Sequence, residues 1–162
     1  METNRPILKA NSAAFNRIAS TLAFVAIADL GIKRFIASTM SADAVITIIP
    51  HWLWIRYIQN DHGAMGMFGT NQGLLIVLAG AVLVGLGFML REAIAHSALA
   101  QIAFGMIAGG AIGNLVDRIA HHYVIDYISV GTFYIFNFAD ACISVGTGLL
   151  IIDALTRGRA RA

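Results

Sequence analysis

Charged residues are scarce in this chain. Of its 162 residues, 11 are Lys or Arg and 9 are Asp or Glu, which together make 12%, whereas 58% are hydrophobic. Soluble domains carry about 25% charged residues. The deficit excludes an ordinary soluble domain and indicates that lipid is the main solvent of the protein. The length allows one domain, which we expect to comprise residues 1–162, and we expect no nucleic-acid partner.

Cysteine and several common catalytic motifs are also missing or nearly so. Cys142 is the single cysteine, which excludes an intrachain disulfide and a metal site built from several thiolates. It lies between apolar neighbours, so we interpret it as a packing residue. The sequence has no His-Glu-x-x-His motif, and the adjacent His121 and His122 cannot face one metal from one helix. A Gly-x-Ser-x-Gly elbow is absent as well. We therefore expect neither a metal nor an organic cofactor.

Long apolar stretches are present instead. There are four, and each is close to the ~20 residues that a helix needs to cross the hydrocarbon core of a bilayer. The second and third contain no charged residue, and the fourth contains only Asp140. We therefore predict an all-α integral membrane protein with four transmembrane helices. The predicted helices comprise residues 18–36, 69–90, 97–116 and 135–152.

The basic residues are distributed unequally between the two sides of this topology. Seven of the eleven precede the first helix, lie between the second and third, or follow the fourth, and so fall on one side. The positive-inside rule makes that side cytoplasmic, so we expect both termini in the cytoplasm and the long connection after the first helix outside. The seven residues are Arg5, Lys9, Arg17, Arg91, Arg157, Arg159 and Arg161.

The outer connection at residues 37–68 has the composition of short strands. Its centre, residues 46–59, is rich in β-branched and aromatic residues, partly alternates, and is interrupted at Pro50. We expect a small extracytoplasmic β-like platform between the first and second helices. Trp52 and Trp54 suit the membrane surface. Two interpretations stay open: the platform anchors the protein at the interface, or it holds an extended peptide.

The third apolar stretch carries glycine at every fourth position. Gly105, Gly109 and Gly113 share one helical face, and a face of small residues lets another helix approach closely. The stripe leads directly to Asn114, which shares a face with Arg118 four residues later. An amide and a guanidinium group can together hold a peptide carbonyl or a carboxylate.

Two aspartates stand out near the outer ends of the third and fourth stretches. Asp126 lies in a short connection between hydrophobic neighbours, and Asp140 begins the fourth helix on the same face as Asn137. Hydrophobic surroundings raise the pKa of a carboxyl group, and a second carboxylate nearby separates the pKa values of the two. One ionised and one protonated aspartate can together activate water and polarise a carbonyl group.

Three further charges belong to the same region. Asp117 is next to Arg118, and we interpret it as the structural partner of that residue. Asp29 and Lys33 lie four residues apart near the outer end of the first helix, in the order that a helical ion pair prefers. We expect Asp29 and Lys33 to support the site or to orient the substrate.

These motifs together resemble the signature of the lipoprotein signal peptidase family (signal peptidase II). The resemblance rests on Gly113-Asn-Leu-Val-Asp-Arg118, Val124-Ile-Asp126, Phe136-Asn-Phe-Ala-Asp140 and the Asp-x-x-x-Lys motif Asp29-Leu-Gly-Ile-Lys33. Their order covers nearly the whole chain, and the combination is specific, although no single motif would be.

The resemblance implies an aspartyl endopeptidase of the bacterial inner membrane, with Asp126 and Asp140 as its catalytic pair. Such an enzyme removes the signal peptide from a prolipoprotein just before a cysteine that carries diacylglycerol. The implied partners are lipidated prolipoproteins and membrane lipid, and we expect a monomer. The implied supporting residues are Asp29, Lys33, Asn60, Gly63, Asn114, Arg118 and Asn137.

The sequence departs from the family pattern in two places. The family motif Asn-x-Gly-Ala-Ala-Phe appears here as Asn60-Asp-His-Gly63-Ala64-Met65-Gly66, which leaves the role of the family asparagine open between Asn60 and Asp61. The segment from Asp126 to Asp140 is also shorter than in many relatives, with Ile135 where proline is usual. The alternative function is a small membrane transporter whose buried acids relay protons, although four helices without inverted-repeat symmetry make it weaker.

Overall fold

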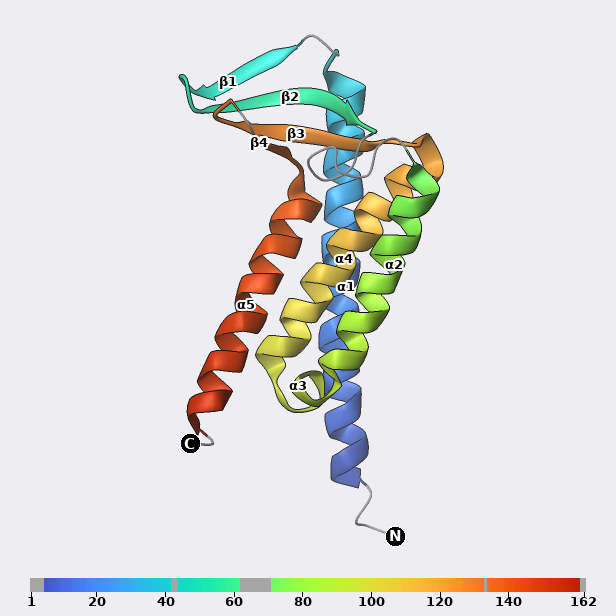
Figure 1. Ribbon diagram of the computed structural model, residues 1–162, viewed down its shortest axis with the longest axis vertical. Helices are drawn as coiled ribbons and strands as arrows, with labels where there is room; N and C mark the ends of the chain where they lie inside the picture. Colours follow the sequence, from blue (N-terminus) through green and yellow to red (C-terminus); the bar gives the residue numbers. More distant parts are fainter. Residues whose placement is uncertain (1–4, 42–43, 62–70, 133, 161–162) are drawn as a thin grey trace.

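The computed structural model describes residues 5–41, 44–61, 71–132 and 134–160, which form a helical bundle with a sheet across one end (Figure 1). Both ends of the chain lie at the other end of the bundle. The helices are α1 (Arg5–Thr39), α2 (Gln72–Met89), α3 (Arg91–His96), α4 (Ala98–His121) and α5 (Phe138–Ala160). The strands are β1 (Val45–Ile49), β2 (Leu53–Asn60), β3 (Val124–Val130) and β4 (Tyr134–Phe136).

Among the described residues, three helices are long and apolar enough to cross a membrane. They are Ser12–Thr39 in α1, the whole of α4, and Phe138–Arg157 in α5. The second predicted span, residues 69–90, is shorter than expected, because Asn71 caps α2 through its side chain and the apolar part runs from Gly73 to Met89. At 1.5 Å per residue this part is roughly 26 Å long, slightly less than the hydrocarbon core. Three of the four spans are therefore confirmed as candidates.

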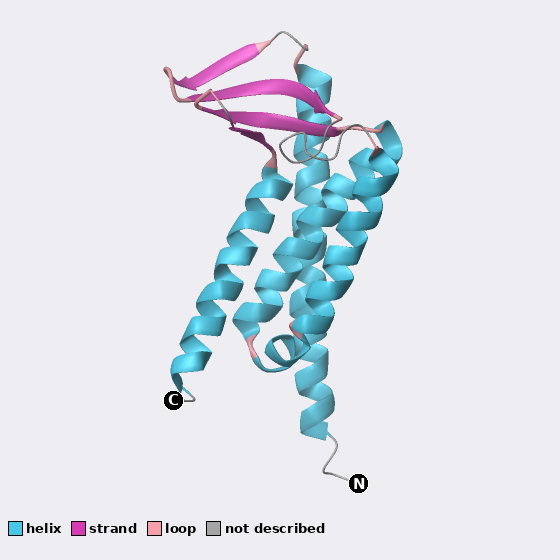
Figure 2. Ribbon diagram, in the orientation of Figure 1, coloured by secondary structure: helices cyan, strands magenta, loops and turns pink. Residues whose placement is uncertain are grey.

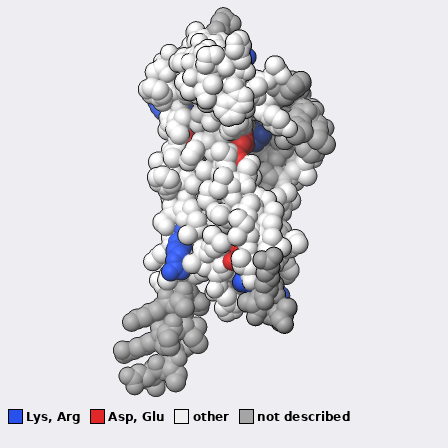
Figure 3. Space-filling view, turned by 90° about the vertical axis from the view of Figure 1, so that its left-hand side faces the viewer, with Lys and Arg blue, Asp and Glu red and all other residues white. Residues whose placement is uncertain are grey.

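The outer surface of the bundle is apolar, as expected for a membrane protein. Phe24, Val84 and Phe88 each expose more than two thirds of their side chains. Figure 3 shows a face whose middle carries no acidic or basic residue, with charge visible only toward the sheet and toward the opposite end. A soluble monomer rarely exposes so continuous an apolar surface. The protein is therefore a membrane protein.

Helix α4 is the centre of the bundle, and its glycines explain why. A Cβ atom on Gly105 would lie 2.8 Å from Thr21, and one on Gly109 would lie 2.7 Å from the carbonyl oxygen of Leu22, both in α1. On another face of α4, a Cβ atom on Gly110 would lie 2.5 Å from the carbonyl oxygen of Ala139 in α5. The predicted glycine face is confirmed: it lets α1 contact α4 at backbone distance.

The sheet differs from the prediction in its origin. It has four antiparallel strands in the order β1-β2-β3-β4, so only half of it comes from the connection after the first span (Figure 2). Strands β3 and β4 come from the segment before α5, where the sequence predicts only a short connection, and the all-α class is corrected accordingly. The reason is long-range pairing: β2 satisfies its second edge with β3, from Leu53 opposite Val130 to Asn60 opposite Val124.

A small hydrophobic cluster fixes the sheet on the bundle. Ile36 and Met40 at the end of α1 pack against Ile125 and Tyr127 of β3, and all four are buried. The Tyr127 hydroxyl also accepts a hydrogen bond from the backbone amide of Phe138, at the start of α5. Strand β3, which carries Asp126, is thereby held against the ends of both α1 and α5.

Candidate functional site

A buried polar cluster lies where the sheet meets the helices. The largest fully buried side chains in the described structure are Lys33, Asn137 and Asp29, none of which is hydrophobic. Burying a charged group costs several kcal/mol unless it is paired and hydrogen-bonded. A cluster of this kind at the end of a membrane bundle is therefore a functional candidate.

Asp140 is held at the amino terminus of α5. Asn137 and Asp140 form a reciprocal cap. The Asn137 side-chain oxygen accepts a hydrogen bond from the backbone amide of Asp140 at 2.9 Å, and the Asp140 carboxylate accepts one from the backbone amide of Asn137 at 3.4 Å. The other carboxylate oxygen accepts the side-chain amide of Asn114 at 2.8 Å. The positive end of the helix dipole also favours an anion at this position.

Asp126 is buried in β3 and accepts one amide on each oxygen. Asn137 donates to Oδ1 and Asn60 donates to Oδ2, both at 2.8 Å. Burial, together with the negative charge of Asp140, raises the pKa of Asp126 to about 6. The two amide hydrogen bonds and the charge of Lys33 act in the opposite direction. Asp126 is thus poised to exchange a proton near neutral pH.

Two asparagines connect the aspartate pair, Asp126 and Asp140. Asn137 donates to Asp126 and also, at 3.0 Å, to the Oδ1 atom of Asn114, whose own amide donates to Asp140. Each amide nitrogen is a donor only, so this chain of contacts fixes the orientation of both asparagines. The two carboxyl groups are thus joined through the side chains of Asn114 and Asn137.

Lys33 is surrounded by oxygen atoms. Its ammonium nitrogen lies 2.7 Å from Asp29, 3.0 Å from Asp117 and 2.8 Å from the Oδ1 atom of Asn114. The predicted ion pair of Asp29 and Lys33 is therefore present. The predicted partner of Asp117 is wrong: Asp117 pairs with Lys33 and not with Arg118. Neighbouring residues on a helix point in different directions, so Asp117 faces α1 while Arg118 faces elsewhere.

Arg118 lines a hollow beside the cluster. This hollow has a volume of about 390 Å³ and lies between α2, α4 and α5. Arg118 and Asn114 are its polar residues, and Arg118 is close enough to Asp140 and Asp126 for electrostatic interaction. An apolar segment seated here would end beside the aspartate pair. The apolar lining residues are Leu75, Leu78, Ala79, Val82, Leu83, Ile107, Ala111 and Ile143.

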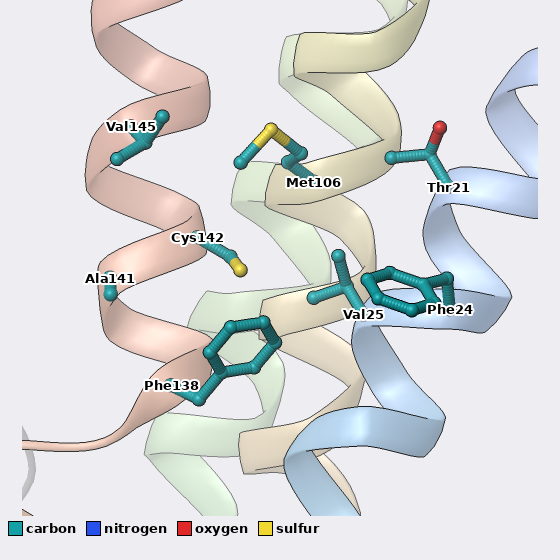
Figure 4. Close-up of a pocket in the computed structure, with 8 residues that line it drawn as sticks. All are labelled: Thr21, Phe24, Val25, Met106, Phe138, Ala141, Cys142 and Val145. Atoms are coloured by element: carbon teal, nitrogen blue, oxygen red, sulfur yellow. The ribbon is translucent and has the colours of Figure 1, made fainter.

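A second hollow of similar volume lies between α1, α4 and α5 (Figure 4). Phe24 and Val25 of α1, Met106 of α4, and Phe138 and Cys142 of α5 point into it. The surface of its lining is apolar. The cysteine is buried and its thiol is free, in agreement with a packing role.

The remaining predicted residues divide between two outcomes. Asn60 donates a hydrogen bond to Asp126, and Asp61 follows directly after β2, so the role of the family asparagine stays open between these two residues. Gly63 lies outside the described residues. Sequence reasoning missed the contacts of Asp117 and Tyr127, since their partners are distant in sequence. In the described part of the chain, no group of three His, Cys, Asp or Glu side chains could hold a metal ion.

The chain is similar to proteins of one known family. A family model described as signal peptidase (SPase) II matches residues 21–156. A lipoprotein signal peptidase of Symbiobacterium thermophilum is 34% identical over 136 residues, which cover 81% of this chain and 90% of that protein. One of Photorhabdus laumondii is 36% identical over 138 residues, or 80% and 82% of the two chains.

Two solved structures, both described as bacterial membrane enzymes, have the same fold. The first superposes with a TM-score of 0.78 at 28% identity and covers 90% of this chain and 91% of its own. The second has a TM-score of 0.72 at 29% identity and covers 85% and 92%. The fold is thus shared with bacterial membrane enzymes, and the sequence is similar to lipoprotein signal peptidases.

Proposed function

This chain belongs to the signal peptidase II family, and we propose that it removes the signal peptide from diacylglyceryl-modified prolipoproteins, cleaving before the lipidated cysteine. The relatives at 34–36% identity are lipoprotein signal peptidases, and the chain covers most of their length. The observation that carries the proposal is the aspartate pair, joined through Asn114 and Asn137 beside an apolar hollow. The alternative of a proton-relaying transporter is not favoured by this family membership.

The proposed mechanism is aspartyl proteolysis. The ionised member of the pair takes a proton from water, whose oxygen attacks the scissile carbonyl carbon, while the protonated member donates a hydrogen bond to the carbonyl oxygen. The proton then passes to the leaving nitrogen as the carbon–nitrogen bond breaks. The raised pKa of Asp126 means that this carboxyl group keeps a proton to higher pH than an ordinary aspartate, which supports a part for Asp126 as the proton donor.

Arg118 and Asn114 are proposed to hold the substrate and the pair in register. Four carboxylates in the cluster, those of Asp29, Asp117 and the aspartate pair, face two cations, Lys33 and Arg118. If every group were ionised, the cluster would carry a net charge of −2, which favours a shared proton on the pair. The position of Arg118 at the edge of the hollow supports a role for its guanidinium group in binding a peptide carbonyl next to the scissile bond.

We further propose that the protein crosses the bacterial inner membrane four times as a monomer, with both termini cytoplasmic and the sheet outside. The basic residues at the chain ends support this orientation. The signal-peptide helix would then enter laterally from the bilayer into the hollow between α2 and α4. Strand β1 exposes apolar residues, as a sheet edge resting on the membrane or on a bound peptide would.

Cleavage by the purified protein in detergent tests the activity. The substrate is a diacylglyceryl-modified prolipoprotein peptide, and the same peptide without the lipid measures lipid dependence. We expect cleavage by the wild type, faster with the lipid, and none by Asp126→Asn or Asp140→Asn. A matched control is Asp153→Asn, which alters another buried aspartate at the far end of the bundle. Substantial cleavage by either folded pair variant would refute the aspartyl mechanism.

A further inference from the structure

Two backbone amides beside the aspartate pair are held by other carboxylates. The amide of Ile125, the residue before Asp126, donates to Asp117 at 3.1 Å. The amide of Ala139, the residue before Asp140, donates to Asp29 at 3.0 Å. Each member of the pair therefore follows directly on a backbone group that a buried carboxylate fixes in place.

The two holding carboxylates share one cation. Lys33 lies 2.7 Å from Asp29 and 3.0 Å from Asp117, and its third contact is the Oδ1 atom of Asn114 at 2.8 Å. A lysine ammonium group has three hydrogens and no acceptor, and three side-chain oxygen atoms lie within 3.0 Å of this one. The Lys33 nitrogen thus connects α1 with two residues of α4. These are Asn114, which donates to Asp140, and Asp117, which accepts the amide of Ile125.

Stability alone does not explain this arrangement. The exposed fractions of Asp29, Lys33 and Asp117 are 0%, 1% and 4%, so all three are removed from water. Desolvation costs several kcal/mol per ion, and apolar side chains of the same size are often as stabilising as a buried ion pair. Asp29, Lys33 and Asp117 are two buried carboxylates with one buried cation. Because apolar side chains would stabilise the bundle equally well, we infer that these charges have a role other than stability.

We propose that Asp29, Lys33 and Asp117 form a positioning triad that sets the separation and orientation of Asp126 and Asp140. The inference rests on the proposed function of that pair. Strand β3 and helix α5 approach the site from different directions, and the triad ties each of them, one residue before its aspartate, to the same nitrogen atom. A displacement of a catalytic group by about 1 Å can reduce the rate about 100-fold, so residues that fix the positions of Asp126 and Asp140 would contribute to the rate.

The same contacts argue against a direct catalytic or substrate-binding role for the triad. Among the described residues, no hydrogen bond joins Asp29, Lys33 or Asp117 to the carboxylate of Asp126 or Asp140. The triad reaches the pair through backbone amides and through Asn114, which donates to Asp140. Its burial also keeps it from the hollow, which Arg118 and Asn114 line. Of the two roles predicted for Asp29 and Lys33, the geometry therefore supports positioning.

Steady-state kinetics on folded variants test the triad. The variants are Asp117→Asn, Asp29→Asn and Lys33→Met, and the control is Asp153→Asn, a buried ion-paired aspartate outside the triad. We expect each triad variant to lower kcat roughly 10- to 100-fold while KM stays within about threefold, because the pair is displaced but the hollow is intact. The control should lower Tm to a similar extent and leave kcat within about threefold.

Two results would overturn the triad. In the first, Asp117→Asn and Lys33→Met lose as much Tm as the control Asp153→Asn and have a kcat no lower than that of the control. The triad would then be merely structural. The other is a raised KM at unchanged kcat, which would assign the triad to substrate binding. Both leave wild-type cleavage and the inactivity of Asp126→Asn intact, whereas a wild type that fails to cleave would overturn the proposed function itself.

Discussion

The two ends of the helical bundle each contain a buried aspartate that pairs with a cation, but the cation is partly exposed at one end and buried at the other. At the far end Asp153 pairs with Arg157 one helical turn later and accepts a hydrogen bond from Ser97, the residue that caps α4. Arg157 leaves 36% of its side chain exposed, so only the carboxylate is removed from water. This is a local pair that closes the ends of two helices.

At the sheet end the charges come from four segments and are not balanced. Lys33 is as deeply buried as its two carboxylate partners, and the aspartate pair adds two further acids with Arg118 as the second cation. A bundle that needed only stability would match acids with exposed cations, as the far end does. The surplus of acid at one end, and not the presence of buried charge, distinguishes the site from the scaffold.

The largest difference between the two ends is expected in catalysis. Asp126→Asn and Asp140→Asn should each reduce kcat by about 1,000-fold or more, because an amide cannot take a proton from water. The double variant should be no worse than either single one, since residues that act as a unit lose their effect together. Asp153→Asn should change kcat by less than about threefold. Initial rates at saturating substrate measure all four, and additive losses in the double variant would contradict a cooperating pair.

The pH dependence of stability should also separate the ends. In the folded protein Asp126 has a pKa of about 6, against 3.8 for an ordinary aspartate, under the influence of Asp140, Lys33 and, from the side of α4, Arg118. Between these values the folded state binds more protons than the unfolded state, so stability falls as the pH rises. The loss has an upper limit of about 3 kcal/mol.

Thermal unfolding in detergent at pH 4.5 and 6.5 measures this effect. The fall in Tm between the two pH values should be smaller in Asp126→Asn than in the wild type, and Asp153→Asn should keep the wild-type fall. An identical fall in the wild type and in Asp126→Asn would show that other groups cause it.

Two glycines, Gly113 at the sheet end and Gly148 midway along α5, give a steric comparison. A methyl group on Gly113 would overlap the Asp29 carboxylate, whereas one on Gly148 would meet nothing within 4 Å. Gly113→Ala should therefore cost about 1–3 kcal/mol of stability and lower kcat, because it displaces a member of the triad. Gly148→Ala should be neutral or stabilising by a few tenths of a kcal/mol, from its higher helix propensity. Tm and kcat of both variants check this, and equal kcat values would weaken the link between Asp29 and the pair.

The smallest effect is expected where a polar contact at the far end is partly exposed. Arg17 of α1 donates a hydrogen bond to Gln101 of α4 at 3.0 Å. Arg17→Met should cost about 0.5–1.5 kcal/mol, the net value of one such bond, and leave kcat unchanged. A clear loss of kcat would mean that the far end also positions the site.

Much of the fold and the site followed from local sequence. The charge deficit and the lengths of the apolar stretches indicate a membrane bundle, since crossing a bilayer is a property of each segment by itself. The polar motifs identified Asn114, Asn137 and the aspartate pair for the same reason: a carboxylate or amide among apolar residues is costly wherever the chain goes.

What only the tertiary structure decided is which of these groups meet. That strands β3 and β4 complete the sheet, that Asp117 turns to Lys33 instead of Arg118, and that Asn60 reaches Asp126 all depend on contacts between segments far apart in the chain. A polar group forms a hydrogen bond or an ion pair only with a partner that the packing of the chain brings within about 3 Å. The composition of the sequence thus determined which groups must find buried partners, and the packing of α1, α4, β3 and α5 determined the partners they found.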